Sequence, residues 1–193
     1  MSTETRQWHL ASRPTGEPTR DDFELREATL PDSGHDEVLL RTLYLSVDPY
    51  MRGRMRDAES YAEPWAVGDP MRAGAVAEVL ASNHADLERG DVVNGNLPWA
   101  EHAVVDGEDL RTVDDSLAPV STALGVLGMP GATAYFGLTD VGEPVAGDTV
   151  VVNGAAGAVG SVVGQIARIG GCDVVGIARS EEHTSELQSP SAI

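Results

Sequence analysis

Residues 151–160 read Val-Val-Asn-Gly-Ala-Ala-Gly-Ala-Val-Gly, and this stretch decides the fold class. It continues an apolar β-branched run at 149–152, which is typical of a buried parallel strand. Residues 158–169 then place Val and Ile at positions 159, 162, 163, 166 and 169, the spacing of one helix face. A Gly-Gly pair follows, and residues 173–178 form a second apolar run. The order strand, glycine loop, helix, strand predicts a parallel βαβ unit.

Glycine stands at positions 154, 157 and 160 of this loop. Gly154 lets the chain turn sharply out of the strand, and Gly157 lets backbone N–H groups approach a pyrophosphate at the helix N-terminus. Gly160 lets the helix pack closely on the strand. With the flanking strands and helix in place, the pattern predicts a dinucleotide site made by Gly154, Gly157, Ala158, Val159 and Gly160. The alternative is a tight strand-to-helix turn that binds nothing.

The residues before this unit follow another pattern. Short apolar and alternating runs separated by Pro and Gly predict an all-β region, a small barrel, over residues 1–118. Its candidate strands are residues 7–10, 23–26, 38–47, 74–80 and 100–105. From residue 119 onwards the sequence predicts a short helix at 121–127 and the start of another at 133–138. Residues 119–178 are therefore expected to begin the nucleotide-binding domain.

The composition is strongly acidic. The 193 residues include 31 Asp and Glu against 13 basic residues, all of them Arg, and the formal net charge is −18. This charge repels nucleic-acid backbones and anionic membranes, so neither is an expected partner. An acidic surface without Lys favours a halophilic source, where salt screens the self-repulsion, although an ordinary acidic protein would look similar.

Cysteine content and hydropathy indicate in which cellular compartment the protein is expected. The single cysteine, Cys172, excludes a disulfide framework and a Cys-rich zinc site. No apolar run is long enough to cross a bilayer, and the polar N-terminus opens no signal peptide. We therefore expect a cytoplasmic protein in a reducing compartment.

Residues 179–189 break every earlier pattern. They read Arg-Ser-Glu-Glu-His-Thr-Ser-Glu-Leu-Gln-Ser, which matches the translation of a common short-read sequencing adapter. Residues 179–193 are therefore expected to be an artefactual tail. The alternative is a real polar tail. The residue that selects NAD or NADP at the ribose would fall here, where Arg179 and Glu181 stand, so the residues alone leave that choice open.

Two further blocks carry candidate site residues. Residues 45–55 read Leu-Ser-Val-Asp-Pro-Tyr-Met-Arg-Gly-Arg-Met, a strand end that delivers Tyr50 and two arginines into a loop. Residues 128–138 read Gly-Met-Pro-Gly-Ala-Thr-Ala-Tyr-Phe-Gly-Leu. By themselves the first block could be an exposed turn and the second an ordinary helix start.

Together the three blocks resemble the zinc-independent branch of the medium-chain dehydrogenase/reductases. The similarity is strongest to NADP-dependent prostaglandin reductases, alkenal/one double-bond reductases and curcumin reductases, and it covers nearly all of residues 1–178. It implies a GroES-like β-barrel domain followed by the start of a Rossmann domain. It also implies NADPH as cofactor and a homodimer for the full-length protein. Cys and His ligand spacings of zinc-dependent relatives are missing from the sequence, so no metal site is expected.

The resemblance implies hydride transfer from NADPH to the β-carbon of an α,β-unsaturated aldehyde or ketone. Tyr50 matches an active-site tyrosine position of relatives and would donate a hydrogen bond to the substrate carbonyl oxygen. A phenol with the ordinary pKa of about 10 stays protonated at neutral pH and so remains a donor. Thr133 matches a position beside the nicotinamide. A quinone reductase of the same superfamily is one alternative. The other is a non-catalytic GroES-like module, since the sequence holds two of the about six strands of such a fold, and the 193-residue chain is expected to be inactive.

Overall fold

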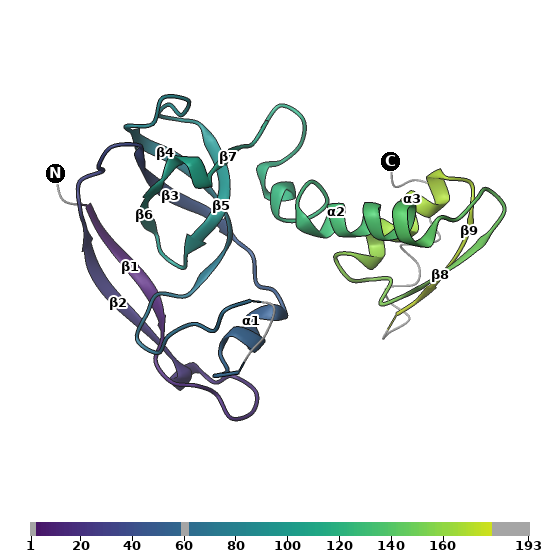
Figure 1. The fold of residues 1–193 in the computed structure, drawn as a ribbon, viewed down its shortest axis with the longest axis horizontal. Helices are drawn as coiled ribbons and strands as arrows, with labels where there is room; N and C mark the ends of the chain where they lie inside the picture. Colours follow the sequence, from purple (N-terminus) through teal and green to yellow (C-terminus); the bar gives the residue numbers. More distant parts are fainter. Residues whose placement is uncertain (1–2, 59–61, 179–193) are drawn as a thin grey trace. The chain divides into compact units, whose positions relative to one another are not determined.

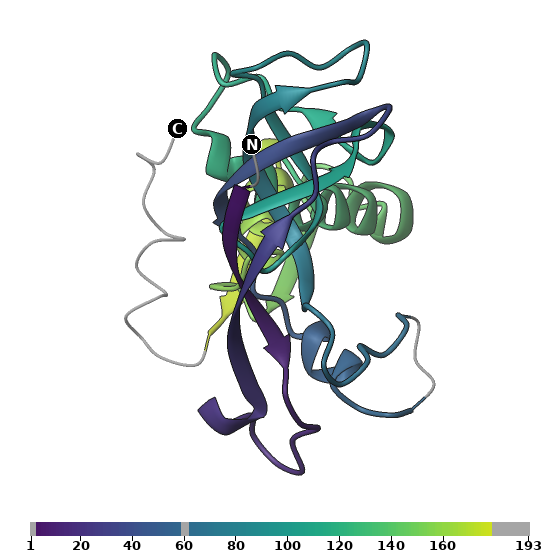
Figure 2. The same cartoon turned by 90° about the vertical axis from the view of Figure 1, so that its left-hand side faces the viewer.

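The computed structural model describes residues 3–58 and 62–178, and these residues form two compact units that divide between Ser121 and Thr122. The expected artefactual tail lies outside the described residues. The first unit is built from β-strands, and the second from helices and a parallel strand pair (Figures 1 and 2). This is the GroES-like barrel and Rossmann start that the sequence predicts.

The first unit contains two antiparallel sheets. Strand β1 (Thr3–Leu10) pairs with β2 (Phe23–Leu30). The second sheet has the order β6-β3-β4-β5-β7. Its strands are β3 (Glu37–Leu45), β4 (Arg72–Ser82), β5 (Val92–Pro98), β6 (His102–Asp106) and β7 (Arg111–Thr112).

Strand β1 connects the two sheets. Trp8 N–H donates to Trp99 O at 2.8 Å, and Trp8 O accepts from Met71 N–H at 3.0 Å. Further bridges join Gln7 to Ala100 and His9 to Pro70. These bonds hold the sheets together, and the buried apolar side chains of the unit form two clusters. The largest fully buried side chains of the unit are Leu10, Leu40, Met71, Leu97, Val38, Val76, Val79 and Val93.

In the second unit, β8 (Thr149–Asn153) and β9 (Asp173–Ile177) pair in parallel through the crossover helix α3 (Gly160–Ile169). This is the βαβ unit that the glycine loop predicts. Helix α3 buries Val162, Gly164 and Ala167. Ile169, which the spacing placed on the inward face, is 76% exposed, because the chain turns away at the following glycines.

Helix α2 (Met129–Phe136) begins four residues earlier than predicted. Pro130 stands in its first turn, where the missing N–H needs no partner, so the proline begins the helix instead of preceding it. A π-helical segment, Gly137–Gly142, continues from it. Of the predicted helix at 121–127, only a 3-10 turn over Val120–Leu124 forms. No helix within the described ranges 3–58 and 62–178 is long and apolar enough to span a membrane.

Candidate cofactor and substrate site

The glycine loop leaves β8 through a left-handed residue. Gly154 has φ +67°, a backbone conformation that side chains disfavour. Its carbonyl then accepts from Gly157 N–H at 2.9 Å, and Ala155 N–H donates to Ile177 O at 3.1 Å. The loop is therefore bonded to the end of β9 as well as to itself.

Gly160 packs against the same turn. A Cβ at position 160 would lie 2.3 Å from Gly154 O and 2.9 Å from Gly154 C, so no larger residue fits without moving the backbone. A Cβ at Gly157 would approach Gly154 O to 3.2 Å. Gly160 therefore lies against the loop residues Gly154 and Ala155, and this contact holds the start of α3 close to the loop.

The N-terminus of α3 offers unpaired donors. Within the described residues, the N–H groups of Ala158, Val159 and Gly160 donate to no backbone carbonyl. No side chain caps the helix, and its first turn contains no acidic residue. Free N–H groups and the positive end of a ten-residue helix suit a bound anion such as a pyrophosphate. These residues therefore fit a dinucleotide.

Thr133 lies on α2, which packs against α3 in the same unit. Its side chain is exposed, and its hydroxyl donates to Met129 O at 2.8 Å. The oxygen of Thr133 keeps its acceptor capacity for a polar group. Beside it, a Cβ at Gly131 would lie 1.8 Å from Val126 O, so glycine is required for α2 to start under the preceding turn.

Tyr50 belongs to the first unit. It begins the short helix α1 (Tyr50–Arg54), where the sequence indicated only a loop. Its ring is half-buried and packs on the cluster of Leu10, Met51, Met55, Trp65, Met71 and Ala73. The structure thus brings the glycine-loop positions together in the second unit, and it places Tyr50 in the first.

A polar turn fixes the start of α1. Ser46 Oγ donates to the Asp48 carboxylate at 2.6 Å, and Ser46 N–H donates to Gly74 O at 2.8 Å. Asp48 O accepts from Met51 N–H at 3.1 Å, which closes the first turn. Pro49 stands at the N-cap with helical φ and ψ. This corner connects the end of β3 to the helix that carries Tyr50.

Arginines surround α1, and sequence reasoning assigned them no contacts. The Arg54 guanidinium lies 4.9 Å from the centre of the Trp65 ring, and its Nε donates to Glu63 O at 2.8 Å. Arg72 donates to Asn96 O at 2.5 Å. Burial lowers the pKa of Arg72, Asp109 raises it, and the positive charge of Arg54 lowers it further. The only available signal was the recurrence of Arg around Tyr50 in a chain with an excess of acid.

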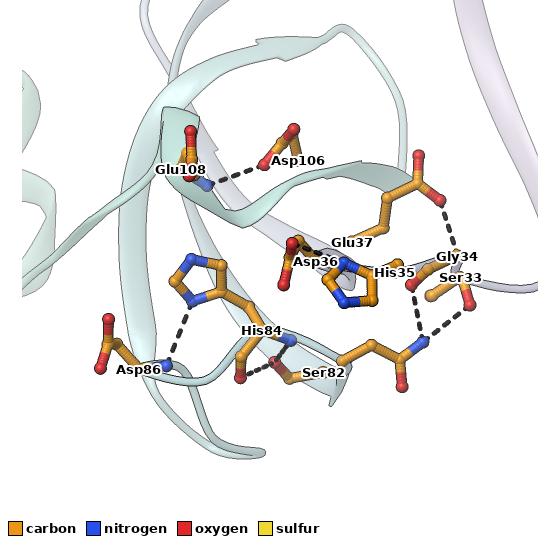
Figure 3. A network of polar contacts seen from close by, with 11 residues as sticks. Ser33, Gly34, His35, Asp36, Glu37, Ser82, His84, Asp86, Asp106 and Glu108 are labelled. Carbon is orange, nitrogen blue, oxygen red and sulfur yellow. Dashed lines mark hydrogen bonds and ion pairs between the residues drawn. The ribbon is translucent and has the colours of Figure 1, made fainter.

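His35 and His84 lie in turns at one end of the five-stranded sheet (Figure 3). The ring of His84 accepts from Asp86 N–H at 3.2 Å, and His35 contacts Asp36 at 2.6 Å. Asp106 accepts from Glu108 N–H at 3.0 Å. These bonds are local and hold turns together. Over the described part of the chain, no three His, Cys, Asp or Glu side chains are grouped so that they could hold a metal ion.

Comparison with known proteins places this geometry in a family. Residues 6–113 match the family described as the N-terminal domain of oxidoreductase. The chain is 52% identical over 198 residues to YfmJ of Bacillus subtilis (strain 168), covering 100% of this chain and 58% of that protein. It is 48% identical to the NADPH-dependent curcumin reductase of Escherichia coli (strain K12), covering 94% of this chain and 54% of the relative. The chain therefore spans slightly more than half the length of these relatives.

The fold of the chain is also similar to that of a solved structure. CurA from Vibrio vulnificus, in complex with NADPH, has a TM-score of 0.85 and 51% sequence identity. The match covers 92% of this chain and 52% of the CurA chain. The fold, the family match and the identity to these relatives agree, and the chain belongs to the medium-chain dehydrogenase/reductase family, beside proteins named as NADP-dependent reductases.

Proposed function

We propose that the protein containing this chain reduces the carbon–carbon double bond of α,β-unsaturated aldehydes or ketones with NADPH. The observation that carries the proposal is the candidate anion site at α3, where three backbone N–H groups have no carbonyl partner among residues 3–58 and 62–178, next to a turn that requires glycine. Two relatives support the chemistry by name, the curcumin reductase already described and the 2-alkenal reductase (NADP(+)-dependent) of Nicotiana tabacum, which is 42% identical over 185 residues.

Bound NADPH supplies the hydride for the β-carbon of the substrate. The N–H groups of Ala158, Val159 and Gly160 would hold the pyrophosphate, and Thr133 would offer an acceptor to the nicotinamide end. Negative charge grows on the substrate carbonyl oxygen as the double bond is reduced. The Tyr50 O–H would donate to that oxygen and lower the barrier. Because α1 is fixed by the Ser46–Asp48 turn, this donor needs little reorganisation during the reaction.

Replacing Tyr50 with Phe in the full-length protein tests this role. The ring and its packing stay, and only the donor is lost, so we expect turnover of a short alkenal to fall by at least about tenfold. NADPH affinity should change little, because its phosphates bind at the glycine loop. Absorbance of NADPH measures turnover, and calorimetry measures affinity. Tyr44→Phe, an exposed tyrosine on β3, is the matched control. Full turnover in Tyr50→Phe would show that Tyr50 only packs.

Four other expectations accompany the proposal. The resemblance implies a homodimer and zinc-independent chemistry, and the composition favours a cytoplasmic, halophilic protein. Each stays a prediction. The net charge of −18 without any Lys is the observation that supports the halophilic interpretation.

A further inference from the structure

The loop at residues 11–19 leads from β1 towards β2. It accepts hydrogen bonds from a side chain of α1 and donates one back to the end of α1. Arg52 donates to Gly16 O from Nε at 3.2 Å and from Nη2 at 2.7 Å, and Nη2 also donates to Pro14 O at 3.1 Å. In return, Arg13 Nη1 of the loop donates to Met55 O at the end of α1, at 3.1 Å. We call Arg13, Arg52 and these three carbonyls the arginine clamp.

The loop that presents these carbonyls is itself held in place. The Asp22 carboxylate accepts from Thr19 N–H at 2.8 Å and from Ser12 Oγ at 2.7 Å. The Thr19 hydroxyl also donates to it at 3.1 Å. The backbone N–H of Thr19 and the hydroxyl of Ser12 lower the pKa of Asp22, and the Arg52 charge contributes. Arg52 therefore bonds to an ordered loop.

Helix α1 needs such support. It has only five residues, and a helix that short does not form on its own in water. Met51 and Met55 are buried and anchor one side. Arg52 follows Tyr50 by two positions, roughly 200° around the helix axis. The two side chains therefore leave the helix in nearly opposite directions, and Arg52 holds the side away from the phenol.

We propose that Arg52 is a positioning residue, which clamps α1 to the 11–19 loop and so sets the direction of the Tyr50 O–H. This inference rests on the function proposed above. Arg52 Nη1 is buried and makes no hydrogen bond in the described residues, although an unpaired buried donor costs free energy. The guanidinium thus bonds to the two loop carbonyls through Nε and Nη2. The planar fork of arginine suits two adjacent carbonyls, which a lysine ammonium serves less well.

The test uses Arg52→Met and Arg52→Lys in the full-length protein, with Arg13→Met as a milder variant that removes only the return bond. In Arg52→Met we expect turnover to fall about tenfold while the KM for NADPH stays within about twofold. Hydrogen exchange of the segment 50–56 should become at least about tenfold faster, since its anchoring is lost. Arg52→Lys should recover part of both effects. Arg6→Met, which breaks the exposed pair with Glu101, is the matched control.

A double-mutant cycle with Tyr50→Phe separates positioning from general destabilisation. If Arg52 acts through Tyr50, Arg52→Met should lower turnover less than about threefold in the Tyr50→Phe background. An undiminished tenfold loss there overturns the inference. Faster exchange with unchanged turnover also overturns it, and so does unchanged exchange. If Tyr50→Phe alone keeps full turnover, the proposed role of Tyr50 fails, and the exchange data still decide whether the clamp holds α1.

Discussion

The two units of the chain bury their apolar side chains to different extents. In the first unit, Leu10, Leu40, Met71 and Leu97 are at most 1% exposed. In the second unit, one face of the β8–β9 pair packs on α3, and none of the described residues covers the other. Val151 on that face is 60% exposed, and its cross-strand partner Val175 is 49% exposed. Parallel sheets are normally covered on both faces. The first unit therefore buries its apolar side chains more fully than the described part of the second unit does.

The largest expected effect is on activity. The second unit has only two parallel strands within the described residues, whereas a dinucleotide fold binds its cofactor across a larger sheet. We therefore expect the 193-residue chain to show no NADPH-dependent turnover, while a protein with the length of its relatives turns over a short alkenal. Calorimetry on the 193-residue chain should find weak NADPH binding at best. A micromolar dissociation constant for NADPH would contradict the expectation that the second unit of the 193-residue chain binds the cofactor only weakly.

A substitution in the glycine loop should affect only the second unit. In the full-length protein, Gly160→Ala places a Cβ 2.3 Å from Gly154 O, so the loop must shift away from its anion-binding geometry. We expect NADPH affinity to fall on the order of tenfold or more. Gly137→Ala is the control, because a Cβ there meets nothing within 4 Å. Equal affinity in a folded Gly160→Ala protein would contradict the need for glycine.

Heating should unfold the two units at different temperatures. All three tryptophans, Trp8, Trp65 and Trp99, belong to the first unit, so their fluorescence reports that unit alone. Helical circular dichroism reports mainly α2 and α3 of the second unit. Because the second unit leaves more apolar surface exposed, its transition should lie at least about 5 °C below the other. Coincident transitions would show that the 193-residue chain unfolds as one cooperative unit.

Salt should act mainly on the first unit. Residues 1–121 contain 24 acidic residues against 11 Arg, whereas residues 122–178 contain four against one. Screening relieves repulsion where the excess of like charge is larger. Molar salt should therefore raise the tryptophan transition by about 4–8 °C, as expected for about 1 kcal/mol of relief, and move the helical transition less. A flat or falling tryptophan transition would count against the halophilic interpretation.

The smallest effect concerns one carboxylate. Hydrogen bonds from Thr19 and Ser12 hold the pKa of Asp22 below its usual value, so ionised Asp22 stabilises the folded first unit at neutral pH. Asp22→Asn should lower the tryptophan transition at pH 7. The difference from the wild type should shrink as the pH falls below the ordinary pKa of about 3.9 towards the folded-state value, where the wild type loses the same charge. If the difference between Asp22→Asn and the wild type stays constant while the pH falls through this range, the carboxylate of Asp22 is not the cause of the difference.

The second unit could be predicted better than the first because its signals are local. The glycine loop predicted β8, α3 and β9, since turn, helix start and packing all depend on residues within one short stretch. In the first unit, β5 escaped prediction because Asn94, Gly95 and Asn96 interrupt its apolar pattern, and only pairing with β4 makes it a strand. Tyr50 could be named from its motif, but the arginine clamp could not, because its partners lie 36 to 42 residues apart in the chain.

The bonds from β1 to the far end of the barrel bear on how the chain is made. Arg6 Nε donates to Glu101 across 95 residues, and the bond of Trp8 to Trp99 O spans a similar stretch. At ribosomal speeds of about 5–20 residues per second, β1 waits roughly 5–20 s for these partners. During that interval the β1–β2 hairpin is a nascent ribbon with an unpaired edge. Early strands of this kind are where chaperones would bind and where neighbouring nascent chains on a polysome could pair wrongly.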